Sequence, residues 1–322
     1  MANTPAGFIP KFETAERSKC KASIMIEGLT GSGKTGLALA LAFTLAGNKW
    51  DTVYHIDTEN KSANLFTGVP FSTGGQVGKF KVFQLTEDIG YKPSNYLICR
   101  SSAKKGGAEV VIEDSISHAW MYEGGVLDLV NKATKNSPKG DKYAAWRDET
   151  VAEEKHRLLT LIRDADVHVI TTVRVKEKFE YIEGEGKKTL TSMGEQQIQQ
   201  DDLKYEPDLV LSMVSPGYSD TTHPVARVIK SRYPMLTKEE SYTFTPELML
   251  QIKLFLEDGA DPLVLLEQQR QDYVQAAKEF LDQKPTAQAI WTVLKDDAGH
   301  KDTKLADLPL SVLKELYMKL TT

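Results

Sequence analysis

Residues 22–46 decide the fold, and they read ASIMIEG (22–28), LTGSGKTG (29–36) and LALALAFTLA (37–46). A short apolar run ends at Gly28, a glycine-rich turn follows, and a segment with a helical pattern begins at Lys34. Residues 28–35 match G-x-x-x-x-G-K-[ST] in full, between an expected strand and an expected helix. That context favours a site for a nucleoside triphosphate over a glycine-rich turn without a ligand.

Each part of this motif has a physical reason. Glycines let backbone N–H groups point inward where a side chain would block a phosphate, and the helix N-terminus adds free N–H groups and partial positive charge. We expect Lys34 to reach the β- and γ-phosphates and the Thr35 hydroxyl to bind Mg²⁺. The predicted ATP-binding residues of the motif are Gly28, Thr30, Gly31, Ser32, Gly33, Lys34, Thr35 and Gly36.

The composition is that of a globular protein. The chain has 322 residues, of which 41% are hydrophobic and 26% charged, with a net charge of −5. No apolar run is long enough to span a membrane, and the N-terminus lacks the layout of a signal peptide. Only Cys20 and Cys99 occur, so we expect a reducing, cytoplasmic setting. The acidic balance restricts any nucleic-acid site to a local patch.

Strands and helices alternate along the first half of the chain. Apolar runs predict strands at 23–26, 52–56, 80–85, 110–112, 167–173, 209–213 and 225–229, and helical patterns at 34–46, 93–104, 119–132 and 146–163. This alternation predicts an α/β fold with a mainly parallel sheet flanked by helices. Three parts are expected: an arm (1–20), a nucleotide-binding domain (21–258) and a small helical C-terminal region (263–322).

Acidic residues at strand ends are candidates for catalysis, because ligands of such sheets bind at the carboxyl ends of the strands. Asp114 follows the strand at 110–112 and is the predicted Mg²⁺ ligand; its neighbour Glu113 is the alternative, and a helix-capping carboxylate is a third interpretation. Glu59 lies two residues past Asp57, so both side chains share one face of an extended segment. A carboxylate there suits activation of water, and a solvated acidic turn is equally compatible with the residues alone.

The strand at 167–173 leads into a predicted hairpin at 176–188. Thr172 is a candidate sensor of the γ-phosphate. Clustered cations suit a phosphate backbone, although interleaved glutamates make a solvated hairpin equally compatible. The predicted DNA-binding residues are Arg174, Lys176, Lys178, Lys187 and Lys188.

Two further groups of residues have both a functional and a structural interpretation. Lys230 and Arg232 face one side of an expected strand end; they are candidates for an arginine finger that completes a neighbouring subunit's ATP site, or a surface pair. His118, beside Trp120, is expected to pack rather than to catalyse. No His or Cys cluster has ligand spacing, so we predict no zinc.

In their order, these segments resemble the RecA-type ATPase core. The sequence is similar to phage-encoded, AAA-type P-loop ATPases of the RecA superfamily over roughly 18–262, through segments such as IDTENKSA (56–63), IEDSISHAW (112–120), HVITTVRVK (168–176) and IKSR (229–232). The resemblance implies that Glu59 is the catalytic glutamate and that Asp114 ends the metal-binding strand.

The same resemblance implies further roles. Lys230 and Arg232 take the place of the lysine pair that reaches across the filament interface, and Phe66 that of the adenine-stacking tyrosine. The glutamine sensor of the γ-phosphate is replaced by Thr172, and the basic loop 132–142 falls near the family's first DNA-facing loop.

Together, these features predict a Mg²⁺-dependent ATPase that acts on single-stranded DNA in phage recombination, annealing or replication. It would be a homo-oligomer, ring or filament, in the host cytoplasm, without membrane contact, and with phage or host replication or recombination proteins as possible partners. The alternative is a nucleotide-gated assembly module that binds protein partners through 263–322. A small-molecule kinase is disfavoured, because no arginine-rich lid follows the glycine-rich loop.

Overall fold

The structure is a computed structural model. It describes residue 15 and residues 17–70, 76–137, 140–164, 166–184, 187–197, 201–214, 223–260 and 262–321. The chain forms two compact units. The larger comprises Lys21–Leu256, and the smaller combines the chain from Glu257 onward with described residues that precede Lys21.

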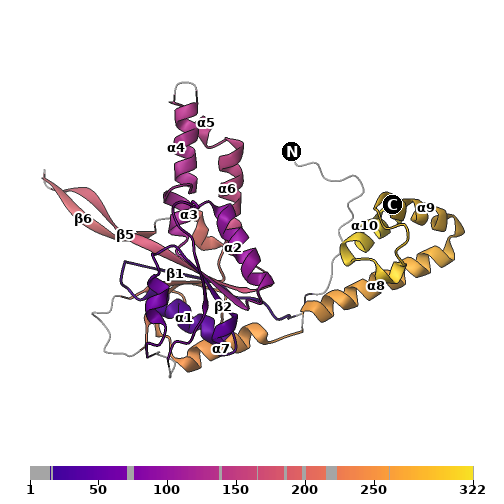
Figure 1. Ribbon diagram of the computed structural model, residues 1–322, viewed down its shortest axis with the longest axis horizontal. Coiled ribbons are helices and arrows are strands. Elements are labelled where there is room, and N and C mark those ends of the chain that lie inside the picture. The colour runs from indigo at the N-terminus through magenta and orange to yellow at the C-terminus, as the bar shows by residue number, and fades with distance from the viewer. Residues whose placement is uncertain are drawn as a thin grey trace. The chain divides into compact units, whose positions relative to one another are not determined.

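The larger unit is built on one sheet with the strand order β3-β2-β4-β5-β1-β7-β8-β9 (Figure 1). The six strands from β3 to β7 run parallel, and β8 and β9 add antiparallel pairs at one edge. The strands of this sheet are β1 (Ser23–Gly28), β2 (Val53–Asp57), β3 (Lys81–Gln84), β4 (Val110–Asp114), β5 (His168–Gly184), β7 (Leu209–Met213), β8 (Val225–Ser231) and β9 (Ser241–Thr243).

One strand continues beyond the sheet. β5 pairs with β1 as far as Arg174, and from Val175 onward it pairs with β6 (Lys187–Gln197) as an antiparallel hairpin. The hairpin predicted at 176–188 is therefore present and longer than the sequence indicated.

Successive side chains of a strand point to opposite faces of the sheet, and each face packs into its own hydrophobic core. One core joins Ile24, Ile26 and Ile112 to α1 (Lys34–Leu45) and α7 (Pro246–Glu257). The other joins the intervening strand residues, such as Met25 and Val111, to helices on the second face. Those helices are α2 (Pro93–Lys105), α3 (Ser117–Met121) and α6 (Glu149–Thr160). This arrangement confirms the predicted α/β fold with a mainly parallel sheet flanked by helices.

Two predicted helices are interrupted. The helix expected at 119–132 is divided into α3 and α4 (Val126–Asn136). Gly124 has φ +77°, and a Cβ at Gly125 would lie 2.7 Å from the carbonyl oxygen of His118, so other residues would be strained here. The helix expected at 146–163 starts later, at α6, where the Asp148 carboxylate accepts from Val151 N–H at 3.3 Å. The short helix α5 (Lys142–Ala145) precedes it.

The smaller unit is helical. Its helices are α8 (Pro262–Gln283), α9 (Pro285–Asp297) and α10 (Leu310–Thr321), with a core around Trp291, Leu308 and Leu316. Residue Ser18 forms a β-bridge with Ala260, which ties the described N-terminal segment to this unit. The domain limits predicted from the sequence stay predictions. Within the described residues, no helix is long and apolar enough to cross a membrane.

Candidate functional site

The glycine-rich loop joins β1 to α1. Gly31 and Gly33 have φ values of +78° and +93°, which are left-handed conformations that favour glycine. A Cβ at Gly28 would lie 2.5 Å from Ser32 Oγ and 3.0 Å from Met213 Cβ, so this position is also restricted to glycine by packing. The loop backbone is thus fixed by its own sequence.

Two polar side chains of the loop are buried. Lys34 folds back over the loop, and its Nζ donates to the carbonyl oxygens of Gly28 at 3.0 Å and Leu29 at 2.9 Å. The Ser32 hydroxyl is buried and has no hydrogen-bond partner among the described residues. A buried hydroxyl without a partner is costly, and a phosphate oxygen is an acceptor that would satisfy it.

Asp114, at the end of β4, collects hydroxyl groups from two other elements. The Thr35 hydroxyl, in the first turn of α1, donates to Asp114 Oδ2 at 2.6 Å, and the Thr172 hydroxyl of β5 donates to Asp114 Oδ1. His55 Nε2 lies 3.7 Å from Asp114 Oδ2. Asp114 is 2% exposed. The strand order places β5 between β1 and β4, and this explains how Thr172 comes to lie between the loop and the carboxylate.

Glu113 lies on the other face of the sheet. Its Oε1 accepts from Arg100 Nε at 3.1 Å and Arg100 Nη2 at 2.7 Å, and both side chains are buried. Burial raises the pKa of Glu113 above its ordinary value, although the charge and hydrogen bonds of Arg100 act to lower it. Glu113 therefore belongs to the core, and Asp114 is the carboxylate that faces the loop.

The segment after β2 is tied to β4. The Asp57 carboxylate accepts from Glu59 N–H at 2.6 Å and Gln84 Nε2 at 3.1 Å, so it fixes the chain instead of facing a ligand with Glu59. Thr58 Oγ1 accepts from Ser115 N–H at 2.9 Å and lies 2.9 Å from His118 Nδ1.

Glu59 is paired with a cation from β5. Arg174 Nε donates to Glu59 Oε1 at 2.8 Å. Burial raises the pKa of Glu59, but the hydrogen bond and charge of Arg174, with the charges of His118 and Lys34, outweigh it, and the net pKa lies below the ordinary value. Glu59 is therefore ionised at neutral pH, as a base must be.

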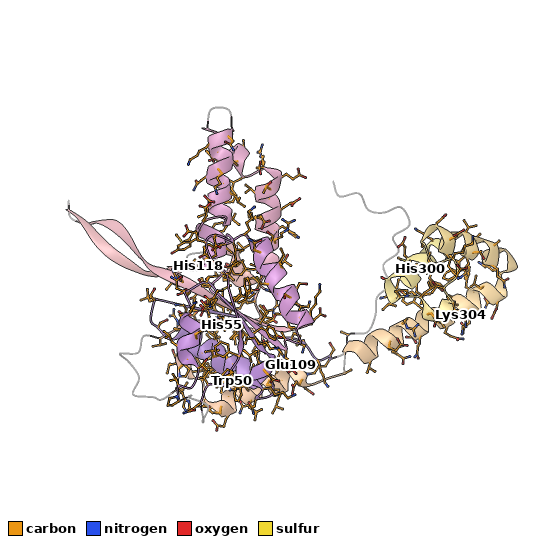
Figure 2. The ribbon with its side chains drawn as sticks, in the orientation of Figure 1. Trp50, His55, Glu109, His118, His300 and Lys304 are labelled. Atoms are coloured by element: carbon orange, nitrogen blue, oxygen red, sulfur yellow. The ribbon has the colours of Figure 1, made fainter. Side chains whose placement is uncertain are left out.

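His118 packs within an aromatic cluster, as the sequence indicated. Its ring lies 4.3 Å from that of Tyr122 and 5.0 Å from that of Tyr91, between centroids. Burial lowers its pKa, and the nearby Arg174 lowers it further. Figure 2 labels His118, which lies on α3, and His55, which lies on β2 within the sheet.

The structure places the remaining predicted residues at different distances from this cluster. Phe66 lies in the 3₁₀ turn Ser62–Phe66, and a Cβ on Gly36 would lie 3.7 Å from its ring, so it lies beside the first turn of α1. Arg174 belongs to the cluster. The other predicted DNA-binding residues lie on the hairpin, on β5 (Lys176, Lys178) and on β6 (Lys187, Lys188).

Lys230 and Arg232 lie at the amino ends of the parallel strands, whereas the loop lies at their carboxyl ends. Because β8 is antiparallel to β7, Lys230 pairs with Val210 near the start of β7, whereas Met213, at the end of β7, contacts the loop. The Lys230 Nζ donates to the carbonyl oxygens of Tyr205 and Pro207, and Arg232 Nη1 donates to Asp208 Oδ1 at 2.9 Å. Neither cation reaches its own subunit's loop.

The residues present fit a magnesium-bound nucleoside triphosphate. The loop supplies backbone N–H groups, a lysine and an unsatisfied buried hydroxyl, and the Thr35 hydroxyl with the Asp114 carboxylate forms the oxygen donor set that Mg²⁺ prefers. Within the described residues, no group of three or more His, Cys, Asp or Glu side chains forms a metal site built by protein alone.

Sequence reasoning missed two features of the site. It assigned Arg174 to DNA and did not pair it with Glu59, which is 115 positions away. It also passed over His55, whose only signal is a histidine in the otherwise apolar run before Asp57. Burial lowers the pKa of His55. The charges of Asp114 and Asp57 act to raise it, but the net pKa lies below the ordinary value.

Comparison with known proteins gives one family match. The model of the family described as AAA domain matches residues 20–243, more than half of the chain. A search of curated proteins finds no match. Among solved structures, the flagellar accessory protein FlaH from Methanocaldococcus jannaschii is similar, with a TM-score of 0.38 and 14% sequence identity, and the match covers 71% of this chain and 86% of that chain.

Proposed function

This chain belongs to the AAA domain family, and from that premise we propose that it is a Mg²⁺-dependent ATPase whose hydrolysis responds to single-stranded DNA. The observation that carries the ATPase proposal is the convergence on Asp114 of hydroxyls from α1 and β5, with Glu59 just past the end of the adjacent strand β2. A metal ligand and a base next to a phosphate-binding loop are what phosphoryl transfer to water requires.

The residues have distinct roles in this proposal. The loop amides and Lys34 hold the phosphates, and Thr35 with Asp114 holds the metal. Mg²⁺, when bound, neutralises charge on the β- and γ-phosphates. Glu59 orients the attacking water and takes its proton. Thr172, bound to Asp114, keeps the metal-binding carboxylate in position and takes the place of a γ-phosphate sensor.

The DNA part of the proposal rests on the β5–β6 hairpin. Lys176 and Lys178 lie on one strand of it and Lys187 and Lys188 on the other, and β5 leads directly from Thr172 and Arg174 into it. Resemblance to phage ATPases of the RecA superfamily supports recombination, annealing or replication as the setting. It also supports a homo-oligomer in which Lys230 and Arg232 act on a neighbour's ATP and Phe66 stacks on adenine.

The first experiment is ATP hydrolysis with and without an unstructured single-stranded oligonucleotide, with Lys34→Ala as the control. Stimulation by DNA that disappears in Lys34→Ala supports the proposal. Replacement of Lys176 and Lys178 by alanine should lower the slope of log affinity against log salt by roughly two, because each lysine that no longer neutralises a phosphate lowers it by about one. An unchanged slope would remove the hairpin from the DNA site.

A second candidate is an assembly module that binds a protein partner through the C-terminal helices. The observation that favours it is the face of α9, where Ile290 and Val293 are 51% and 59% exposed. Deletion of 263–322 separates the two functions. Loss of partner binding with DNA-stimulated hydrolysis intact would assign assembly to these helices and the ATPase to the larger unit.

A further inference from the structure

Arg174 stands where the nucleotide loop and the hairpin meet. Its backbone pairs with Gly28, the first residue of the glycine-rich loop, and the next residue, Val175, pairs with Gln197 of β6. A displacement of the hairpin base therefore acts on the residue that is in register with the loop.

Three side chains hold Arg174. Its N–H donates to Ser117 Oγ at 2.9 Å, its Nε to Glu59 Oε1 at 2.8 Å and its Nη1 to the Tyr122 hydroxyl at 3.1 Å. The guanidinium carbon also lies 6.0 Å from the centroid of the Tyr122 ring. Arg174 and Glu59 are 26% and 23% exposed. The pair is thus partly shielded from water, yet within reach of a ligand.

The contact has two opposite effects on Glu59. It fixes the carboxylate, but it also compensates its charge, and a carboxylate held below its ordinary pKa is a weaker general base. The titratable and charged groups that face Glu59 are Arg174 from β5, His118 from α3 and Lys34 from α1. Arg174 is hydrogen-bonded to it.

We propose that the Arg174–Glu59 ion pair, called here the latch, holds Glu59 as a weak base. A phosphate oxygen opens the latch when it binds the guanidinium and so releases the carboxylate. This inference rests on the proposed ATPase function. It follows from the planar guanidinium, which binds phosphate and carboxylate with the same geometry, so that the two anions compete for it. The phosphate comes either from single-stranded DNA at the hairpin or from the γ-position of the nucleotide at the loop.

The test compares Arg174→Gln with the wild-type protein at saturating MgATP. If DNA opens the latch, the wild-type rate is low and rises with oligo(dT), whereas Arg174→Gln starts roughly threefold to tenfold higher and gains nothing from DNA. The acid limb of its pH–rate profile also shifts to higher pH, because the pKa of Glu59 returns toward its ordinary value. Arg227→Gln, at an exposed arginine of β8 whose guanidinium lies 3.8 Å from Glu239, is the matched loss of charge and should behave as the wild type.

A second arm separates the two sources of phosphate. If the nucleotide opens the latch, the rates of the wild type and Arg174→Gln agree without DNA, and Arg174→Gln weakens binding of ATPγS at least tenfold while binding of ADP is unchanged. The variant Tyr122→Phe keeps the ring and removes the hydroxyl that Arg174 binds. In the DNA case it should raise the basal rate by roughly twofold, with an unchanged unfolding temperature.

Two results would overturn the latch. One is a fall of Arg174→Gln to the rate of Glu59→Gln, which would make Arg174 a support for the base; the other is no change in either rate or ATPγS affinity. The ATPase proposal fails differently, when neither the wild type nor Arg174→Gln shows phosphate release that depends on Lys34. A wild type that is inert, beside an Arg174→Gln variant that hydrolyses ATP, would support the latch in its strongest form.

Discussion

Charged residues are held in different ways at the two ends of the parallel strands, which we call the carboxyl edge and the amino edge of the sheet. At the carboxyl edge, Asp114 and Glu59 are bound by side chains 58, 79 and 115 positions away, from α1 and β5. At the amino edge, Lys230 and Arg232 are bound by the loop 205–208, within 25 positions. Side chains of α1 and β5 thus converge on the two carboxylates at the carboxyl edge, whereas the two cations at the amino edge bind a single neighbouring loop.

The amino edge also ties the sheet together. His168 begins β5, and its Nδ1 accepts from Ala22 N–H at 2.9 Å beside the start of β1. This bond joins the starts of β1 and β5, four residues before Thr172 on β5. If the comparison is correct, substitutions at the carboxyl edge change hydrolysis, and those at the amino edge change stability or assembly.

The largest effect is expected for Asp114→Asn. The change removes the negative charge that the metal requires and keeps the shape of the side chain, so kcat should fall by about 1,000-fold, which corresponds to about 4 kcal/mol. Phosphate release measured across a Mg²⁺ titration tests this expectation. A rate within tenfold of the wild type at saturating Mg²⁺ would show that the metal site lies elsewhere.

Glu113, the neighbour of Asp114 in the sequence, is expected to affect stability and not hydrolysis. Arg100→Met leaves Glu113 buried without its cation and removes bonds to the carbonyls at the end of α6, so the free energy of unfolding should fall by about 3 kcal/mol. Hydrolysis per folded molecule should be unchanged. Urea unfolding measures the loss, and adding Glu113→Leu should recover much of it. A variant of normal stability would contradict the structural role of the pair.

Much of this organisation could be predicted from the sequence. The glycines at positions 28, 31 and 33 of the loop follow from its backbone and packing, and the apolar runs mark the strands. Alternation along β4 also predicts that only one of Glu113 and Asp114 faces the loop, because adjacent residues of a strand face opposite sides of the sheet.

The rest depends on which strands are neighbours. A sequence pattern does not give strand order, so the placement of β5 between β1 and β4, which brings Thr172 to Asp114 and Arg174 to Glu59, could not be read from it. The antiparallel direction of β8 likewise moves Lys230 to the far edge. The break at Gly125 depends on the carbonyls that surround it.

A smaller effect, on stability alone, is expected at His168. Burial, with Lys21 and Lys253 nearby, lowers its pKa to about 3 in the folded state, against about 6.5 when unfolded. Below pH 6.5 the unfolded chain takes up a proton that the folded one refuses, so this contribution is present above pH 6.5 and is lost as pH falls toward 3. Between pH 6.5 and 5 the loss is about 2 kcal/mol.

The comparison with His168→Asn isolates this contribution, because the amide oxygen can replace Nδ1 as the acceptor for Ala22. The variant's unfolding free energy should depend less on pH over this range than that of the wild type. ATP hydrolysis at pH 8 should be the same in both. Equal pH dependence would mean that His168 is not the group responsible.

The smallest effect on stability is expected for the double variant Lys230→Ala, Arg232→Ala. Both side chains are partly exposed, and Arg232 pairs with Asp208 at the surface, so unfolding should change by about 1 kcal/mol or less. Its hydrolysis depends on assembly. If these cations act on a neighbour's ATP, the variant hydrolyses slowly while its own loop still binds ATP.

Mixing separates action in trans from simple damage. Lys34→Ala keeps the cations and lacks a working loop, and the double variant has the reverse defect. In an equal mixture with random order, half of the subunits have an intact loop and half of their neighbours have intact cations, so about a quarter of the wild-type rate should return. If the rate only averages the two variants, the cations do not act across an interface. Their bonds to loop 205–208 would then be their whole role, and the amino edge would be structural throughout.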